Sequence, residues 1–128
     1  MGGLLEWGAD WLEQQRTRHL TKQVTYERGL DSAQVQATAG KTVFALDDGM
    51  GGVRRIESRD FLVLAEDLVL AGEVVLPETG DRIRESQGGR DFIYEVMAPG
   101  NEPPWRYSDA YRRTLRIHTK EVEEEPTP

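Results

Sequence analysis

The stretch Arg59-Asp60-Phe61-Leu62-Val63-Leu64 is apolar at four successive positions, and for that reason it decides the kind of fold. Side chains of a strand alternate between two faces, so consecutive apolar residues require burial on both faces. The segment is either a central strand or a strand covered by another element, and we favour coverage by an N-terminal helix. The longer apolar run from Phe61 to Ala71 is interrupted by Glu66 and Asp67 and is shorter than the roughly 20 residues of a membrane span. We therefore expect no membrane partner.

The beginning of the chain predicts an amphipathic helix over residues 3–19. Its apolar stripe has the i, i+3/i+4, i+7 spacing of a helix. The stripe consists of Leu4, Leu5, Gly8, Trp11, Leu12 and Gln15. Acids come first and bases last along this segment, which matches the direction of the helix dipole.

The pattern changes after Leu20 and predicts a β body over residues 22–120. Short segments of period two are separated by Gly, Asp and Pro, as is typical of antiparallel strands and their turns. The expected elements are half-buried strands at 24–26 and 35–39, a strand at 91–96 with Phe92, Tyr94 and Val96 on one face, and a closing strand at 111–122.

These elements predict the fold class α+β, with an N-terminal amphipathic helix plus a small antiparallel β-barrel or sandwich of about six to seven short strands. The chain has 128 residues, the size of one ordinary domain. We expect a single domain over residues 1–120. Residues 121–128 are acidic, end in Pro and have nothing to bury, so we expect a flexible tail in isolation.

A loop rich in glycine is predicted between strands at 41–45 and 53–56. It consists of Asp47, Asp48, Gly49, Met50, Gly51 and Gly52. Asp-Gly and Gly-Gly supply the positive φ angles of tight hairpins, and the scarcity of apolar side chains predicts a mobile loop. The loop resembles a fragment of a calcium loop but lacks its alternating ligands and closing Glu, so we predict no metal here.

The composition excludes several classes of function. With 23 acids against 16 bases, the net charge of −7 disfavours association of the whole molecule with nucleic acid. The absence of cysteine excludes a disulfide framework, a thiol nucleophile and Cys-ligated zinc. We expect folding in an intracellular environment.

The sequence offers few candidate catalytic residues. Neither His19 nor His118 has a carboxylate at a fixed spacing, and we interpret them as a helix-end residue and a residue of a solvated strand face. An acidic segment could bind a divalent cation through Glu57, Asp60, Glu66 and Asp67. We interpret it instead as an exposed acidic face or a channel wall. The predictions are therefore a non-enzymatic protein, no cofactor and no metal.

The last third of the chain combines basic and aromatic residues, followed by acids. The basic and aromatic residues are Trp105, Tyr107, Tyr111, Arg112, Arg113 and Arg116, and the acids are Glu121, Glu123 and Glu124. Arg, Trp and Tyr are enriched at the hot spots of protein interfaces, so we favour a protomer or partner interface. The alternative is a small β-barrel module that binds nucleic acid through the face formed by residues 105–120.

The order of these features resembles a family of virus proteins. The chain is similar to the head-tail joining proteins of tailed bacteriophages in the order of its elements. These are a helix, the 47–52 loop, the segment Ser58 to Val63, the Gly80-Asp81-Arg82-Ile83 hairpin, the strand at 92–96 and a closing basic strand. The similarity is greatest to the lambda-type tail-attachment proteins and their head-closure relatives.

The resemblance implies a non-enzymatic virion protein of the phage neck. Such a protein forms a homo-oligomeric ring between a portal or adaptor protein and a tail-tube or tail-terminator protein, and genome DNA passes through the ring. The protein would be made in the host cytoplasm before assembly. An acidic lumen agrees with this expectation, because like charge lets DNA slide instead of adhering.

Overall fold

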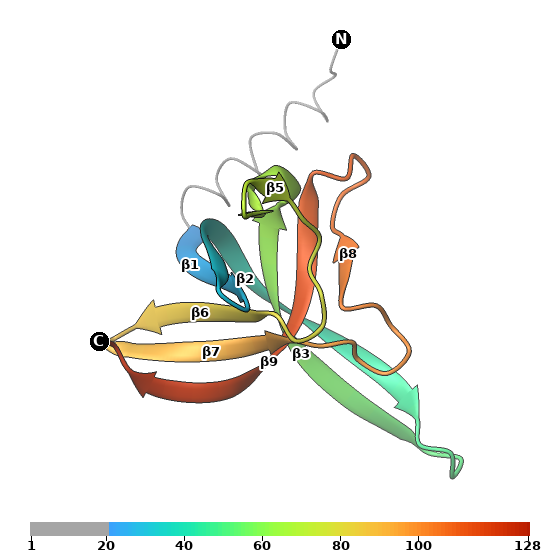
Figure 1. Cartoon of the computed structure of the whole chain (residues 1–128). Coiled ribbons are helices and arrows are strands. Elements are labelled where there is room, and N and C mark those ends of the chain that lie inside the picture. Colours follow the sequence, from blue (N-terminus) through green and yellow to red (C-terminus); the bar gives the residue numbers. More distant parts are fainter. Residues whose placement is uncertain (1–20) are drawn as a thin grey trace, which may run out of the picture.

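The computed structural model describes residues 21–128, which form an antiparallel β structure (Figure 1). The strands are β1 (Thr21–Arg28), β2 (Asp31–Asp47), β3 (Val53–Leu64), β4 (Val69–Leu70), β5 (Glu73–Val74), β6 (Arg82–Gln87), β7 (Arg90–Val96), β8 (Trp105–Tyr107) and β9 (Thr114–Pro126), with a 3-10 helix η1 (Ala65–Asp67). The antiparallel β body predicted from the sequence is confirmed. The predicted helix over residues 3–19, including His19, lies outside the described residues.

The main sheet closes on itself to form a barrel. Its strand order is β3-β2-β1-β6-β7-β9-β8, and an additional pairing of β3 with β9 closes the first six strands, while β8 pairs with β9 alone. Phe61 pairs with Ala39 of β2 on one side and with Ile117 of β9 on the other. The apolar segment from Arg59 to Leu64 is therefore a central strand, which is one of the two interpretations that its sequence allowed.

The core fills the barrel with the inward-facing residues of all six closing strands. Its members include Val24, Tyr26, Val35, Ala37, Phe61, Val63, Ile83, Tyr94, Val96, Leu115 and Ile117, and Phe92 packs against them. The predicted common face of Phe92, Tyr94 and Val96 is thus confirmed. Leu68 and Leu70, from the segment that holds η1 and β4, are also part of the core.

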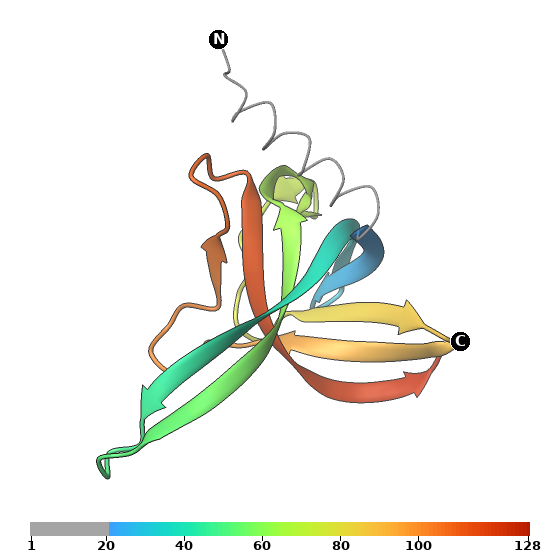
Figure 2. The same cartoon turned by 180° about the vertical axis from the view of Figure 1, so that it is seen from behind.

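Strands β2 and β3 extend beyond the barrel as a long hairpin, which Figures 1 and 2 show projecting from the body. β1 pairs with β2 only as far as Thr38, and β9 pairs with β3 only from Arg59 onward. Residues 41–58, which lie between these limits, are called the arm below. The predicted turn at 47–52 is confirmed at the tip of the arm, where Asp47 pairs with Val53. Its mobility stays a prediction.

The structure corrects the expectation for the end of the chain. β9 begins at Thr114, not at Tyr111, and continues to Pro126, where it pairs with Arg90 of β7. The acidic residues 121–125 do not form an unpaired tail, because basic side chains of the barrel face them. Arg82, Arg84 and Arg90 form ion pairs with Glu123, Glu125 and Glu124, respectively. Within residues 21–128, no helix has the length and apolarity needed to cross a membrane.

Candidate interaction surfaces

A buried polar cluster lies where the arm leaves the barrel. The Asp60 carboxylate is fully buried and contacts Nδ1 of His118 at 2.9 Å and Nη1 of Arg116 at 2.7 Å. It also accepts hydrogen bonds from the hydroxyls of Thr42 and Ser58, the latter at 2.6 Å. The cluster therefore ties both strands of the arm to β9 through one carboxylate.

Burial alone would raise the pKa of Asp60, but the hydrogen bonds from His118, Ser58, Thr42 and Arg116 outweigh it and hold the pKa well below its usual value. A buried charge is tolerated when it is paired and hydrogen-bonded in this way. The cluster is consequently a fixed ionic joint.

The solvated strand face predicted for His118 is wrong. Its side chain is buried, and its ring makes an edge contact with the ring of Phe44 in the arm, with 5.1 Å between centroids. The contacts of His118 with Asp60 and Ser58 do not form a nucleophile relay, because both partners approach the same nitrogen, Nδ1. A relay needs the acid and the nucleophile on opposite nitrogens.

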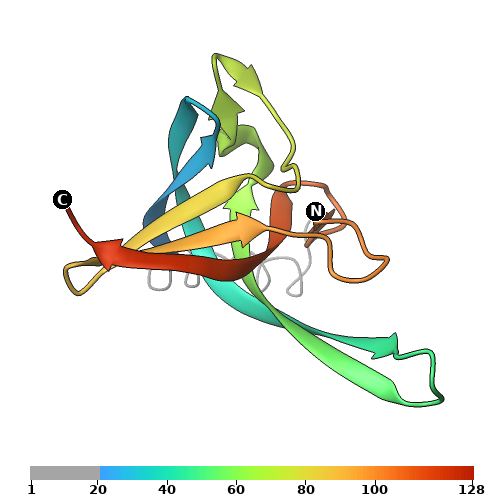
Figure 3. The ribbon, with the colours of Figure 1, turned by 60° about the horizontal axis from the view of Figure 1, so that its bottom comes forward.

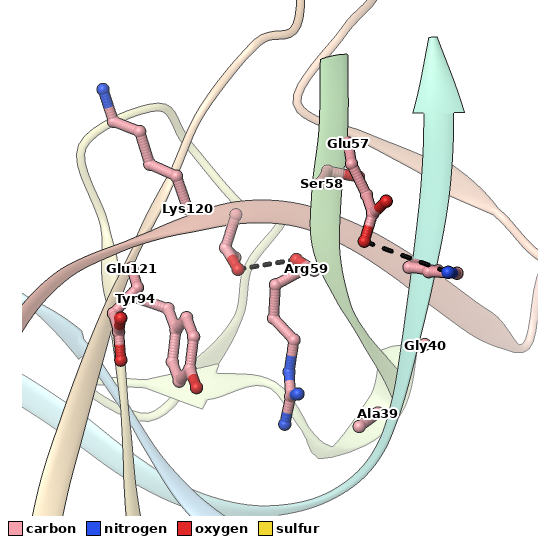
Figure 4. Close-up of a pocket in the computed structure, with 10 residues that line it drawn as sticks. Ala39, Gly40, Glu57, Ser58, Arg59, Tyr94, Lys120 and Glu121 are labelled. Atoms are coloured by element: carbon pink, nitrogen blue, oxygen red, sulfur yellow. Dashed lines mark hydrogen bonds and ion pairs between the residues drawn. The ribbon is translucent and has the colours of Figure 1, made fainter. Parts of the chain in front are cut away.

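A groove of about 540 Å³ lies beside this cluster, between the base of the arm and the β7–β9 pair (Figure 4). Arg59 lies in its wall and places its guanidinium 5.3 Å from the centroid of the Tyr94 ring. One Nη of Arg59 contacts Glu85 at 3.0 Å, whereas its buried Nε has no hydrogen-bond partner among residues 21–128. Lys120 and Glu121 line the opposite wall, so the groove presents both signs of charge.

The structure brings together most of the predicted aromatic and basic interface. The rings of Trp105 and Tyr107 meet edge to face at 5.0 Å, and the guanidinium of Arg112 lies over the Tyr107 ring at 5.8 Å. Arg113 lies over the Tyr111 ring at 5.8 Å, and Tyr111 is 81% exposed. We call this set of five residues the aromatic–basic surface.

The remaining predicted interface residues lie elsewhere. Arg116 is directed to the buried Asp60. Glu121 lines the groove, and Glu123 and Glu124 pair with arginines of β6 and β7. The predicted pairing of these acids with arginines of a neighbouring copy is not tested, but two of the three acids already have partners in their own chain.

The candidate acidic metal ligands are not brought together. Asp60 is buried in its ionic joint, Glu57 pairs with Lys41 at 4.0 Å, and Glu66 and Asp67 lie on η1. Over the described residues 21–128, no group of three or more His, Asp or Glu side chains is placed to hold a metal ion.

Sequence reasoning missed Thr42, Ser58 and Arg59 as structural residues. A signal was available for the ionic joint, since Asp60 interrupts an apolar segment and a buried acid needs partners. Arg116 and His118 share one face of a strand, and they are those partners. Nothing in the sequence places Arg59 beside Tyr94, because that contact depends on the register of the closed barrel.

A closed β-barrel with a projecting arm and an exposed aromatic–basic surface defines the chain as a small β-barrel interaction protein. The chain belongs to the phage head-tail joining protein family, whose model matches residues 2–126. It is thus a structural connector protein of a phage virion. None of the curated proteins matches the chain.

Proposed function

We propose that this protein forms a homo-oligomeric ring in the neck of a tailed phage and joins the portal-closed head to the tail. The observation that carries the proposal is the family match over residues 2–126. The expected partners are further copies of the chain, a portal or adaptor protein on the head side, and a tail-tube or tail-terminator protein on the tail side. Genome DNA passes through the ring, and the protein is made in the host cytoplasm.

The aromatic–basic surface is the proposed contact with a head or tail protein. Tyr111 is exposed, and Arg106, Arg112 and Arg113 form no ion pair with the described residues 21–128. Exposed aromatic side chains, and Arg side chains that form no ion pair in the free protein, are typical anchors of protein interfaces. β8 also lies at the edge of the sheet, which supports the same surface.

The acidic charge of the chain supports passage of DNA in preference to tight binding of DNA. A net charge of −7 repels phosphates at distances beyond a few ångströms.

A deletion strain of the phage or prophage that encodes the chain tests the proposed function. Loss of the connector predicts DNA-filled heads without attached tails, together with free tails, in electron micrographs. Supplying the intact chain from a plasmid should restore tailed particles. Tailed particles in normal number without the chain would contradict the proposal, and a salt-dependent shift of DNA by the purified chain would favour the nucleic-acid module instead.

A further inference from the structure

The two faces of the arm differ in how they are covered. On the inner face, Phe44 packs on His118, and Leu46 approaches Gly100 of the loop before β8. The outer face is exposed along its whole length. Strand pairing places Val43, Ala45, Val53 and Arg55 together on it. Lys41 and Glu57, which pair with each other, lie at its base, and Asp47, which accepts a hydrogen bond from the Gly49 amide, lies at its tip.

The outer face of the arm exposes several apolar side chains to solvent, which is unusual for a surface that stays uncovered. Val53 is 70% exposed and Val43 is 52% exposed. Arg55, on the same face, forms no ion pair within the described residues. An apolar strip with an unpaired cation is a surface that gains from being covered by an acidic and apolar partner.

A second exposed surface has the complementary composition. It is the knob, which we define as residues 64–76 and which contains η1, β4 and β5. Val69 and Val74 are cross-strand partners, lie on one face of the β4–β5 pair, and are 38% and 63% exposed, respectively. Leu64 and Leu76 are also exposed. Around them, Glu66, Asp67 and Glu73 have no ion-pair partner in the described part of the chain.

The two surfaces cannot meet within one copy. Figures 1 and 3 show β5 at one end of the molecule and the tip of the arm at the other. Among residues 21–128, neither surface can therefore cover the other within one copy, and the complementary surface is present on every other copy of the same chain.

We propose that the outer face of the arm in one copy docks on the knob of the next copy. Val43, Ala45 and Val53 pack against Val69 and Val74, and Arg55 faces Glu66, Asp67 or Glu73. Two different patches form this contact, so it is heterologous, and repetition closes a ring when the rotation between copies divides a full turn. The inference rests on the proposed ring and identifies the surfaces that form it.

The absence of cysteine allows a direct test. The double variant Val53→Cys/Val74→Cys is introduced into the full chain in the phage, and assembled particles are oxidised and run on a non-reducing gel. The expected result is a ladder of covalent multimers of the chain. A matched control carries Val53→Cys with Leu30→Cys, because Leu30 is fully exposed in the β1–β2 turn outside both surfaces. We expect the ladder to exceed the control by about tenfold or more.

The outcomes separate this inference from the proposed function. Absence of the chain from particles contradicts the proposed function itself. A chain that is present in particles but forms no ladder above the control contradicts only the arm-to-knob contact. Crosslinks of Val74→Cys to a head or tail protein would overturn the contact as well. A crosslink from Val74→Cys to an added cysteine within residues 1–20 of the same copy would also overturn the arm-to-knob contact.

A charge exchange gives a second, independent test. Arg55→Glu should weaken self-association by about two- to fivefold, the usual size of one exposed ion pair. Glu73→Arg should act in the same direction, and the double variant Arg55→Glu/Glu73→Arg should recover the loss, as followed by sedimentation of the purified full chain. Failure of recovery with Glu73→Arg, and likewise with Glu66→Arg and Asp67→Arg, would overturn the charge pairing.

Discussion

Nδ1 of His118 lies 2.9 Å from Oδ1 of Asp60, and both side chains are buried at the point where the arm joins the barrel. The other carboxylate oxygen contacts Arg116, whose strand is β9. Through Thr42 and Ser58, the same carboxylate reaches both strands of the arm. The direction of the arm is consequently fixed by one ionised side chain together with the packing of Phe44 on His118.

Replacing this charge should cost substantial stability. Asp60→Asn keeps the shape of the side chain but leaves the Arg116 guanidinium without a counter-charge. We expect a loss of about 3 kcal/mol, near the low end for a broken buried ion pair, because Arg116 is partly exposed. Urea denaturation at neutral pH measures it. The control Asp31→Asn changes an exposed acid at the start of β2 and should stay within about 0.5 kcal/mol of the parent.

The pH dependence of the Asp60→Asn effect has a defined sign. The folded pKa of Asp60 is lowered below its value in an unfolded chain, which is about 4. The stabilisation by the carboxylate is therefore complete above that value and is lost as the pH falls towards the folded pKa. The stability difference between parent and Asp60→Asn should shrink from pH 7 to pH 3, and a constant difference would show that the charge is not its source.

Replacing Gly100 is predicted to weaken the packing of the loop on the arm. It has a positive φ of 58°, and a Cβ at this position would lie 2.6 Å from Cδ2 of Leu46. Gly100→Ala combines backbone strain of about 1–2 kcal/mol with this collision. Gly29→Ala is a matched control, because its φ is 60° and nothing lies within 4 Å of the added Cβ. Thermal unfolding should show a larger loss for Gly100→Ala, and the added Leu46→Ala should reduce the excess.

The tip of the arm is predicted to be more mobile than its strands. Gly49 and Gly51 have positive φ angles, and Met50 is 89% exposed. Few hydrogen bonds hold the turn within the described residues. The Asp48 amide donates to the carbonyl of Gly52, and backbone amides of the turn donate to the carboxylates of Asp47 and Asp48, for example Met50 N to Asp48 Oδ1 at 2.7 Å. Amide nitrogen relaxation of the free protein should show lower order at residues 49–52 than at 42–46. Equal order in the two ranges would contradict the prediction.

The strands were predictable where one face is buried and the other is solvated. Val24 and Tyr26, and likewise Val35 and Ala37, alternate with polar residues in the sequence, and this pattern follows directly from burial of one face inside a barrel. The closing strand was more difficult, because both of its faces are buried over residues 117–119 and the charges of its acidic end are paired with arginines of neighbouring strands. This pairing of acids with arginines depends on which residues of the neighbouring strands lie opposite them. That strand register cannot be predicted from the local sequence.

The candidate surface was predictable only in part, for a related reason. Trp105, Tyr107 and Arg112 are close in sequence and remain close in the structure. Arg116 follows them closely in the sequence, yet its side chain pairs with Asp60, which lies 56 residues earlier in the chain. Residue type and spacing therefore predict an interface, whereas long-range pairing determines which of the predicted residues keep exposed side chains.

The free members of the aromatic–basic surface should contribute most of its binding energy. Tyr111 is 81% exposed and contacts its own chain mainly through Arg113, so Tyr111→Ala should leave the unfolding temperature nearly unchanged. If Tyr111 is an anchor for a head or tail protein, its truncation should cost about 2 kcal/mol of binding, which is about a thirtyfold loss of affinity.

Glu124→Gln is the comparison, since Glu124 pairs with Arg90 in its own chain and this substitution should affect assembly little. The measurement is the fraction of tailed particles formed with each variant over a range of salt concentrations. Raising salt should weaken assembly only modestly, because the contact depends on buried aromatic area more than on exposed charge. Normal tailing with Tyr111→Ala but failure with Glu124→Gln would mean that β9, and not the aromatic–basic surface, carries the contact.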